Sequence, residues 1–372
     1  MLFYPFEEQF NLLSAFFQQL DTSDQYKKNN TADSPSWSAA VFDGQAAMIS
    51  VIIPTRNRAN LLEPALLSIL NQDSIQSEYE VLVVDNGSTD DTQKVINRYK
   101  KKPLNLDGIY APELGLHIGR HAGLNAAKGN ILVFADDDIE AFPTWISSIK
   151  SAFSDQKTAM VGGNNYPLFL TPPPDWLDQM WNRPTLRGCK SISSLSVIEF
   201  TASPIEISPY LVWGCNFAIR KDVLIKAGGF HPDGMPKELI RFRGDGETHV
   251  SRYVAETGMK CLFHPGASVY HKVTPDRMTF TYFRQRGFNQ GVSDSYTQLR
   301  KQDETAQSSK HNFVKRIMSY AFRKSLSFLD SAEVKRAFNE LKIGYREGYA
   351  FHQAAYRDDP EVREWVHRTT YI

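Results

Sequence analysis

The sequence has little of what marks a disulfide scaffold, a zinc ribbon or a protein that coats nucleic acid. Its 372 residues include only three cysteines, which are far apart and form no CxxC pair. This usage argues against a disulfide framework or a zinc ribbon and suits a reducing compartment. Lysine plus arginine and aspartate plus glutamate each number 42, so the basic excess expected of a nucleic-acid-binding protein is missing.

Long apolar runs and a targeting signal are also missing. The longest uninterrupted apolar stretches, such as 131–135, are only a few residues long, whereas a membrane-spanning helix needs about 20. Residues 1–8 carry acidic side chains and no basic cluster, which argues against a signal peptide. We therefore expect a cytoplasmic protein that is at most peripheral at the inner face of a membrane.

What is present is the composition and patterning of a globular α/β protein, with 42% hydrophobic and 23% charged residues. From residue 48 onward, short buried-strand runs alternate with amphipathic helical segments. We expect strands at 49–53, 79–84, 109–111 and 131–135, and helices at 59–71, 90–101 and 118–128. This alternation predicts a mostly parallel sheet covered by helices, with the ligand beyond the carboxyl ends of the strands.

The second half of the chain is less regular. Residues 164–212 form a loop-rich and aromatic-rich insertion. The pattern then resumes, and from about residue 277 the chain is mainly helical. The expected elements are strands at 214–220 and 268–271 and helices at 221–227 and 246–257. Near the start, residues 3–20 have the spacing of an amphipathic helix, and residues 21–47 are polar and typical of a linker.

Three consecutive aspartates directly follow the apolar run 131–135. Crowded carboxylates repel one another, and a divalent cation relieves that repulsion; hard ions such as Mg²⁺ and Mn²⁺ prefer oxygen ligands. Side chains alternate in an extended chain, so Asp136 and Asp138 share a face while Asp137 points away. The alternative is a solvated turn in which Asp138 caps the next helix.

Four sequence blocks occur in order, namely VIIPTRNR at 51–58, VVDNGSTD at 83–90, GRHAGLNAAKG at 119–129 and FADDD at 134–138. Together they resemble the family 2 glycosyltransferases, and the resemblance covers about residues 48–290. It implies the GT-A fold, in which a mostly parallel, Rossmann-like central sheet is flanked by helices. Here that fold would carry helical N- and C-terminal appendages.

The resemblance also sets the expected domain organisation. Residues 1–47 would be an N-terminal helix and linker, and residues 291–372 a helical C-terminal subdomain. The catalytic domain would span 48–290, with a nucleotide-binding half at 48–140 and an acceptor-binding half at 141–290. The helix at 3–20 would pack against the C-terminal subdomain or against a second subunit, so a homo-oligomer stays open.

On the donor side, the resemblance implies a nucleotide-binding role for Pro54, Thr55 and Arg56, which would contact the base and ribose. Asp85 would bind the base, and Arg120 would help to hold the nucleotide. The family usually has alanine and asparagine where this chain has Gly119 and His121. That departure affects details of base contact and leaves the arginine in place.

The resemblance implies a divalent cation, Mn²⁺ or Mg²⁺, at the acidic cluster. Asp136 would contact the ribose or the metal shell, with Asp137 also among the nucleotide-binding residues, and Asp138 would ligate the metal that bridges the diphosphate. His271, which ends a short strand, would be a third metal ligand. Arg277, with Arg284 and Arg286 after it, resembles the arginine-bearing segment near the diphosphate.

The general base is expected in a Gly-Glu-Asp-like block, and this chain has Gly-Asp-Gly-Glu at 244–247. In an ungapped alignment, the usual aspartate falls on Gly246, so either Asp245 or Glu247 must accept the acceptor's proton. Glu247 would begin a helix, whose dipole stabilises its negative charge. We slightly favour Glu247 but keep both residues.

Two features concern the acceptor. Trp176 and Trp213 lie in and around the insertion, where their rings would stack on a sugar or fill a core. Residues 310–346 contain nine lysines and arginines and three acidic residues. Basic amphipathic helices of this kind contact anionic membranes, which would suit a lipid-linked acceptor, although a solvated helical subdomain is the alternative.

These observations predict a metal-assisted, inverting glycosyltransferase that takes its sugar from a UDP-, GDP- or dTDP-linked donor. The acceptor would be a hydroxyl of a glycan, of a lipid-linked molecule or of another compound, and no nucleic-acid partner is expected. A nucleotidyltransferase is disfavoured because residues 55–58 contain no glycine. A catalytically silent nucleotide-sugar or glycan-binding protein is the third hypothesis, prompted by the shifted base motif.

Overall fold

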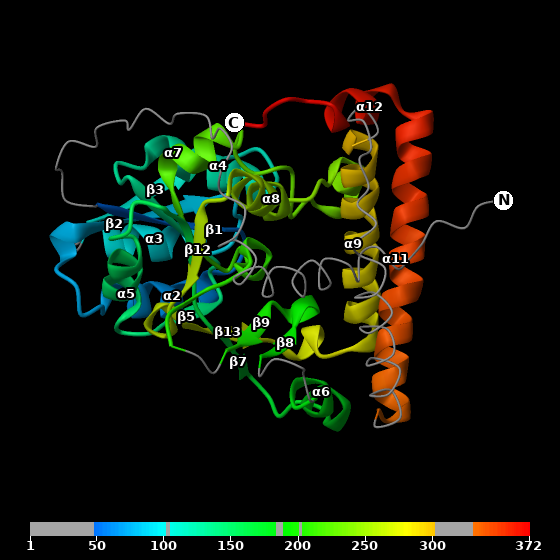
Figure 1. Cartoon of the computed structure of the whole chain (residues 1–372), viewed down its shortest axis with the longest axis horizontal. Coiled ribbons are helices and arrows are strands. Elements are labelled where there is room, and N and C mark those ends of the chain that lie inside the picture. The colour runs from blue at the N-terminus through cyan, green and yellow to red at the C-terminus, as the bar shows by residue number, and fades with distance from the viewer. Residues whose placement is uncertain (1–47, 102–104, 184–188, 201–202, 302–329) are drawn as a thin grey trace, which may run out of the picture.

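The computed structural model describes residues 48–101, 105–183, 189–200, 203–301 and 330–372. An eight-stranded mixed sheet forms the centre of the fold (Figure 1), in the order β10-β12-β6-β11-β4-β1-β2-β3. Its strands are β1 (Ile49–Thr55), β2 (Tyr79–Asp85), β3 (Leu106–Tyr110), β4 (Ile131–Ala135), β6 (Thr158–Gly162), β10 (Ile205–Glu206), β11 (Asn216–Arg220) and β12 (Lys260–Phe263).

The parallel half of this sheet brings polar strand ends to one edge. β1 pairs in parallel with both β2 and β4, and β2 pairs in parallel with β3. All residues of β1, β2 and β4 are buried, which explains their continuous apolar runs. The register places Thr55 opposite Asp85 at the carboxyl ends of β1 and β2. β11 then reverses direction, pairing antiparallel with β4 and β6.

Helices cover both faces of the sheet, and the alternation of side chains along β1 divides the core between them. Ile53 packs in one cluster with Leu62 of α2, whereas Ile52 packs on the opposite face with Leu124 of α4. The first face is covered by α2 (Ala59–Leu70), α3 (Thr92–Lys100) and α5 (Trp145–Ala152), and the second by α4 (Leu116–Ala126), α7 (Lys221–Lys226) and α8 (Glu247–Thr257).

A second, five-stranded sheet positions part of the site. Its order is β5-β13-β7-β9-β8, and α6 (Asp175–Trp181) lies in the same region. β13 pairs antiparallel with β5, so that His271 lies opposite Ile139, the residue directly after the three aspartates. The strands are β5 (Ile139–Ala141), β7 (Asn165–Phe169), β8 (Lys190–Ile192), β9 (Val197–Glu199) and β13 (Val269–Val273).

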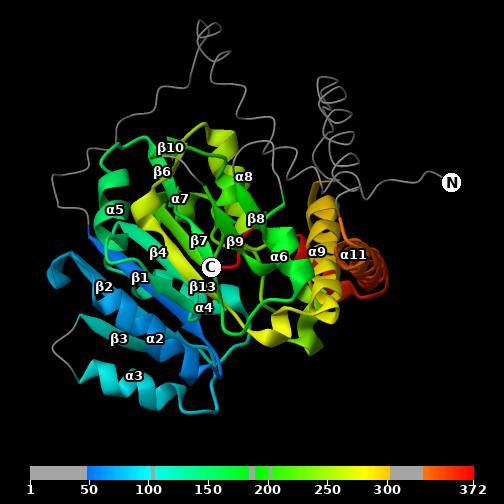
Figure 2. The same ribbon diagram turned by 90° about the horizontal axis from the view of Figure 1, so that it is seen from below.

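The C-terminal part of the chain is a pair of long helices, α9 (Phe280–Lys301) and α11 (Ala332–Asp358), which lie side by side in Figures 1 and 2. Their backbones approach very closely at glycines. A Cβ atom at Gly344 would lie 1.9 Å from the carbonyl oxygen of Arg284, and one at Gly291 would lie 2.1 Å from that of Tyr345. The helix α12 (Pro360–Val366) follows α11.

Short 3-10 helices connect several of these elements. They are η1 (Gln76–Glu78), η2 (Ser193–Leu195), η3 (Pro209–Leu211), η4 (Lys237–Phe242), η5 (Pro265–Ala267) and η6 (Pro275–Arg277). Among the described residues, no helix is both long and apolar enough to cross a bilayer.

The strands and helices expected between residues 49 and 135 are present, with shifts of a few residues at their ends. The sequence did not predict β6, β10 or β12. Of the second sheet it predicted only β13, as the strand expected at 268–271, whereas β7, β8 and β9 lie in the insertion 164–212. The expected boundary after residue 290 falls within α9. The expected helix at 3–20, the linker at 21–47 and most of the basic stretch 310–346 lie outside the described residues; its last part, from Ala332, is in α11.

We predict that Gly344→Ala lowers the free energy of unfolding by about 1–3 kcal/mol, the usual cost of overpacking. Helix propensity alone gives the opposite sign, because alanine is favoured over glycine by about 1 kcal/mol inside a helix. Urea unfolding followed by circular dichroism measures the difference. Ala350→Leu adds bulk to an exposed position of the same helix and should change stability by less than about 0.5 kcal/mol. A stabilised Gly344→Ala protein would contradict the close helix contact.

A second prediction concerns His352, which is fully buried between the two long helices. Burial lowers its pKa to about 4. Because its ordinary pKa is about 6.5, the unfolded chain binds a proton that the folded chain does not bind as the pH falls below that value. Wild type therefore loses stability relative to His352→Leu between about pH 7 and about pH 5, by about 2 kcal/mol.

The measurement is urea unfolding of both proteins across that pH range. Above pH 7, the histidine is neutral in both states, so the stability difference between the two proteins should stay constant. A difference that stays equally constant down to about pH 5 would show that the histidine is not held neutral by burial.

Candidate active site

The loops after β1 and β2 are tied together at the carboxyl edge of the sheet. The backbone N–H of Asn57 donates to Ser88 Oγ at 2.9 Å, and the N–H of Thr89 donates to Asn57 Oδ1 at 2.7 Å. Asp85 accepts the N–H of Ser88 at 2.8 Å and thereby closes the turn after β2. The strand ends that carry Thr55 and Asp85 therefore share one hydrogen-bonded edge.

The other two residues of the first block lie beside this edge. Pro54 is buried within β1, and Arg56 is exposed directly after the strand. A Cβ at Gly119 would lie 3.1 Å from Cβ of Pro54. Gly119 therefore lies where helix α4 approaches β1.

The three aspartates after β4 point in different directions. Asp137 is buried and accepts hydrogen bonds from Thr55 Oγ1 at 2.7 Å and Arg58 Nη1 at 2.6 Å. Asp138 is also buried, and its Oδ2 accepts from Arg58 Nη2 at 2.7 Å and Arg277 Nη1 at 3.3 Å. Asp136 is partly exposed. Asp137 is thus held by the end of β1, and Arg58 also joins it to Asp138.

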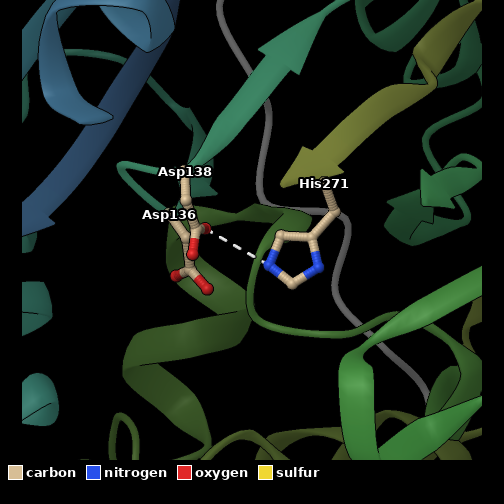
Figure 3. Close-up of side chains that lie close together, drawn as sticks. All are labelled: Asp136, Asp138 and His271. Carbon is tan, nitrogen blue, oxygen red and sulfur yellow. Dashed lines mark ion pairs between the residues drawn. The ribbon is translucent and has the colours of Figure 1, made fainter. Parts of the chain in front are cut away.

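Asp136, Asp138 and His271 form a group that could hold a metal ion (Figure 3). One ligand atom from each lies within 4.8 Å of the others. Nε2 of His271 is 3.2 Å from Oδ1 of Asp138, and that buried carboxylate oxygen has no hydrogen-bond partner among the described residues. Two carboxylates and one imidazole suit Mn²⁺ and are compatible with Mg²⁺. The residues present therefore fit a divalent cation, which would satisfy the unpartnered oxygen.

The charges around the aspartates differ in their effect on each carboxyl group. Burial raises the pKa of Asp137 to about 7, although the charge of Arg58 opposes the rise. Burial also disfavours the charged form of Asp138, but the charges of His271 and Arg58 outweigh it and hold the pKa of Asp138 below its usual range. Asp138 is thus prepared to act as an anionic ligand.

Arg120 connects the acidic cluster to the start of α8. It lies on α4 and is almost fully buried. Its Nη2 is 3.9 Å from Oδ1 of Asp136, and its Nη1 donates to Oε2 of Glu247 at 3.5 Å. The other oxygen of Glu247, Oε1, accepts the N–H of Gly214 at 3.2 Å. The guanidinium therefore lies between Asp136, directly after β4, and Glu247, the first residue of α8.

Comparison with known proteins agrees with this geometry. Residues 50–227 match the model of the family described as Glycosyl transferase family 2. This segment belongs to glycosyl transferase family 2. The relatives include Glycosyltransferase AglE of Haloferax volcanii, 28% identical over 231 residues that cover 61% of this chain and 67% of the relative. Another is a validoxylamine A glucosyltransferase of Streptomyces hygroscopicus subsp. jinggangensis, 25% identical over 50% of this chain and 47% of the relative.

A solved structure supports the fold of this family 2 chain. The mannosyltransferase PcManGT from Pyrobaculum calidifontis aligns over 95% of this chain and 91% of its own, with a TM-score of 0.51 and 19% identity. This likeness confirms the expected GT-A architecture, an α/β fold with a mixed and mostly parallel sheet.

Asp245, one of the two candidate bases, is buried in a network that joins three elements. Its Oδ1 lies 2.5 Å from Nδ1 of His231, and its Oδ2 accepts from Arg252 at 3.0 Å and from Thr297 of α9 at 2.8 Å. Burial would raise the pKa of Asp245, but the charges of His231 and Arg252 hold it below the usual range. Both of its oxygens are engaged in links between α8, α9 and the loop at 231.

The two tryptophans expected at the acceptor have different surroundings. Trp176 is buried, stacked on Phe280 at 4.9 Å and in edge contact with Phe283 at 5.1 Å. The expectation of acceptor contact is corrected for Trp176, because its ring packs in the core between α6 and α9. Trp213 is only partly buried, and it directly precedes Gly214, whose N–H contacts Glu247.

Of the expected arginines, Arg277 contacts the acidic cluster, whereas Arg284 pairs with Glu347 of α11. Arg58 was not assigned a role from the sequence, although it makes close contacts with both Asp137 and Asp138. Its position in the block after a strand end was the available signal. Its partner aspartates are about 80 residues away in the sequence, a separation that residue patterns do not connect.

We predict that Asp245→Asn lowers the free energy of unfolding by about 3–5 kcal/mol, because removing one partner leaves the remaining buried charges uncompensated. Denaturant unfolding measures the loss. Asp222→Asn is the matched control, since Asp222 forms an exposed pair with Lys226 that is worth at most about 0.5 kcal/mol. Equal stability of the two variants would contradict the structural role of Asp245.

Proposed function

We propose that this chain transfers a sugar from a nucleotide-linked donor to a hydroxyl group of an acceptor, with inversion at the anomeric carbon. The observation that carries the proposal is the convergence of three groups at one edge of the sheet. These groups are the metal-ligand cluster Asp136, Asp138 and His271, the buried Arg120, and Glu247. An activated donor, its leaving group and a proton acceptor need such groups close together.

On the donor side, the hydrogen-bonded edge formed by Thr55 and Asp85 would receive the nucleoside. Arg120 would contact the nucleotide, and Asp136, Asp138 and His271 would hold a divalent cation. When bound, that cation would neutralise charge that develops on the departing nucleoside diphosphate. The structural neighbour PcManGT was solved in complex with GDP-Man and Mn²⁺, which is consistent with this arrangement. UDP-, GDP- and dTDP-sugars all remain candidate donors.

On the acceptor side, Glu247 would accept the proton of the attacking hydroxyl. Its position as the first residue of α8 and its contact with Arg120 stabilise the carboxylate. Asp245 is less suited to the role, because its carboxylate is buried and held by His231, Arg252 and Thr297, whereas the side chain of Glu247 is partly exposed. The hydroxyl oxygen would form its bond to the anomeric carbon as the bond to the diphosphate oxygen breaks. One such displacement, with one protein base, inverts the anomeric configuration.

The proposed acceptor is a carbohydrate, either free or attached to a lipid. Trp213 supports this, because it directly precedes Gly214, which contacts Glu247, and its ring would stack on a sugar. One relative, 35% identical over 27% of this chain, is the GalNAc(5)-diNAcBac-PP-undecaprenol beta-1,3-glucosyltransferase of Campylobacter jejuni. A chondroitin synthase of Escherichia coli is 31% identical over 64% of this chain. Contact of the basic stretch 310–346 with a membrane would accompany the lipid-linked form.

The donor site is tested by calorimetric titration with UDP, GDP and dTDP, with and without Mn²⁺. We expect one nucleoside diphosphate to bind more tightly in the presence of Mn²⁺. Asp136→Asn should reduce that gain by about tenfold, because it removes one charged ligand of the cation. Asp73→Asn, which changes an aspartate near α2 and outside the site, should bind like wild type.

Turnover assays with the matching nucleotide sugar and a panel of glycan and lipid-linked acceptors distinguish the functions. Release of nucleoside diphosphate supports sugar transfer, whereas release of pyrophosphate from a nucleoside triphosphate would indicate a nucleotidyltransferase. Metal-dependent binding without turnover on any acceptor would favour a catalytically silent binding protein.

We predict that Glu247→Gln lowers kcat by about 10²–10⁴-fold, the usual contribution of a general base. The affinity for the nucleoside diphosphate should change much less, since glutamine keeps the shape and the contact with Gly214. The matched control is Glu256→Gln, an exposed glutamate at the other end of α8. Retention of wild-type kcat by Glu247→Gln would exclude Glu247 as the base.

A further inference from the structure

Residues 367–372, here called the return segment, run from α12 back to the catalytic domain and reach α4 (Figures 1 and 2). Tyr371 anchors the segment on α9, where its hydroxyl lies 2.9 Å from that of Tyr296. A Cβ at Gly229 would lie 2.5 Å from Cγ1 of Ile372 and 2.6 Å from Nε2 of His121. The glycine, with a φ of +80°, thus leaves space that both the segment and His121 use.

His121 joins the return segment to the catalytic domain through both of its ring nitrogens. Nδ1 lies 2.8 Å from the carbonyl oxygen of Tyr371, and Nε2 accepts the N–H of Phe230 at 2.9 Å. A carbonyl oxygen only accepts, so Nδ1 carries the proton and the imidazole is neutral. Burial supports the neutral form by lowering the pKa of His121 to about 4.

Phe230, which donates its N–H to His121, also contacts Arg120 through its ring. The guanidinium carbon of Arg120 lies 5.1 Å from the centre of the Phe230 ring, within the range of a cation–π contact. Phe230 is itself held edge-on by Phe134 at 4.8 Å and by Phe217 at 5.5 Å. The same guanidinium contacts the acids that the proposed reaction uses. A continuous path of contacts therefore runs from the return segment to Arg120.

We propose that His121 is a positioning residue that couples the return segment to Arg120 and so sets the affinity of the site for a nucleoside diphosphate. The inference rests on the proposed function, because it takes Arg120 as a nucleotide contact. Binding energies couple in both directions. A bound nucleotide therefore stabilises the return segment as much as the docked segment strengthens nucleotide binding.

The first test compares His121→Leu with Val95→Ala, which removes buried apolar bulk from α3, on the opposite face of the central sheet from α4. The probe is whichever of UDP, GDP and dTDP binds wild type with Mn²⁺, titrated by calorimetry. We expect the Kd to rise about tenfold in His121→Leu and to stay at the wild-type value in Val95→Ala. Thermal unfolding shows that each variant is folded, and Phe230→Leu has the same expected effect should His121→Leu not fold.

A double-mutant cycle separates positioning from a general loss of stability. In a Phe230→Leu background, where the ring that links His121 to Arg120 is gone, His121→Leu should raise the Kd by less than about twofold. Fully additive effects would overturn the proposal, because His121 would then act by another route. Hydrogen exchange provides a second readout: amides of residues 367–372 should exchange more slowly when the nucleotide binds wild type, and this slowing should be lost in Phe230→Leu.

The outcomes distinguish this inference from the function on which it rests. If wild type binds none of the three nucleoside diphosphates with Mn²⁺, the proposed function fails. If wild type binds one of them and His121→Leu binds it equally well, the function stands and the positioning role of His121 is refuted.

Discussion

The site depends on the cost of burying adjacent negative charges at the end of a strand. Asp137 and Asp138 are almost completely buried directly after β4, where water cannot screen them. Each carboxylate therefore requires a cationic or hydrogen-bonding partner. Arg58 supplies one partner to both residues, Arg277 and His271 approach Asp138, and Thr55 donates to Asp137.

Those partners come from segments that are far apart in the sequence, so the fold has to bring them together. Arg58 follows β1, which lies next to β4 in the parallel sheet. His271 comes from β13, which reaches the acids by pairing with β5 in the second sheet. The assembly of the two sheets therefore also brings the partners that compensate the negative charge of the buried aspartates. Within the described part of the chain, the candidate metal ligands include one buried carboxylate oxygen that still lacks a hydrogen bond.

Much of the fold of residues 48–140 could be predicted from the sequence because its signals are local. The fully buried strands β1, β2 and β4 appear as apolar runs, and the polar residues Thr55 and Asp85 mark where two of them end. The second sheet could not be predicted in the same way. Strands such as β8 and β9 have three residues each, too few for a period to be visible, and their pairing is decided by distant residues.

The site shows the same division between local and distant information. Alternation along the chain separates Asp137 from its neighbours, but which cation faces it is a matter of tertiary contact, as Arg58 shows. The pair Asp245 and Glu247 was ambiguous in the sequence because both are acidic and two residues apart. Asp245 differs from Glu247 in being buried and in contacting His231 and Arg252. Burial and these contacts depend on the fold, so the sequence pattern does not show them. Trp176 was similarly ambiguous, because an aromatic ring suits a sugar and a core equally well.

The pairing of β13 with β5 has a consequence for the lengths that the chain tolerates. His271 faces inward toward Asp138, whereas its neighbour Tyr270 is substantially exposed. A slip of one residue would exchange the two faces and present a phenol to the acids in place of the imidazole. Insertions or deletions of a single residue between β12 and β13 should therefore be poorly tolerated, even though that connection contains none of the proposed site residues.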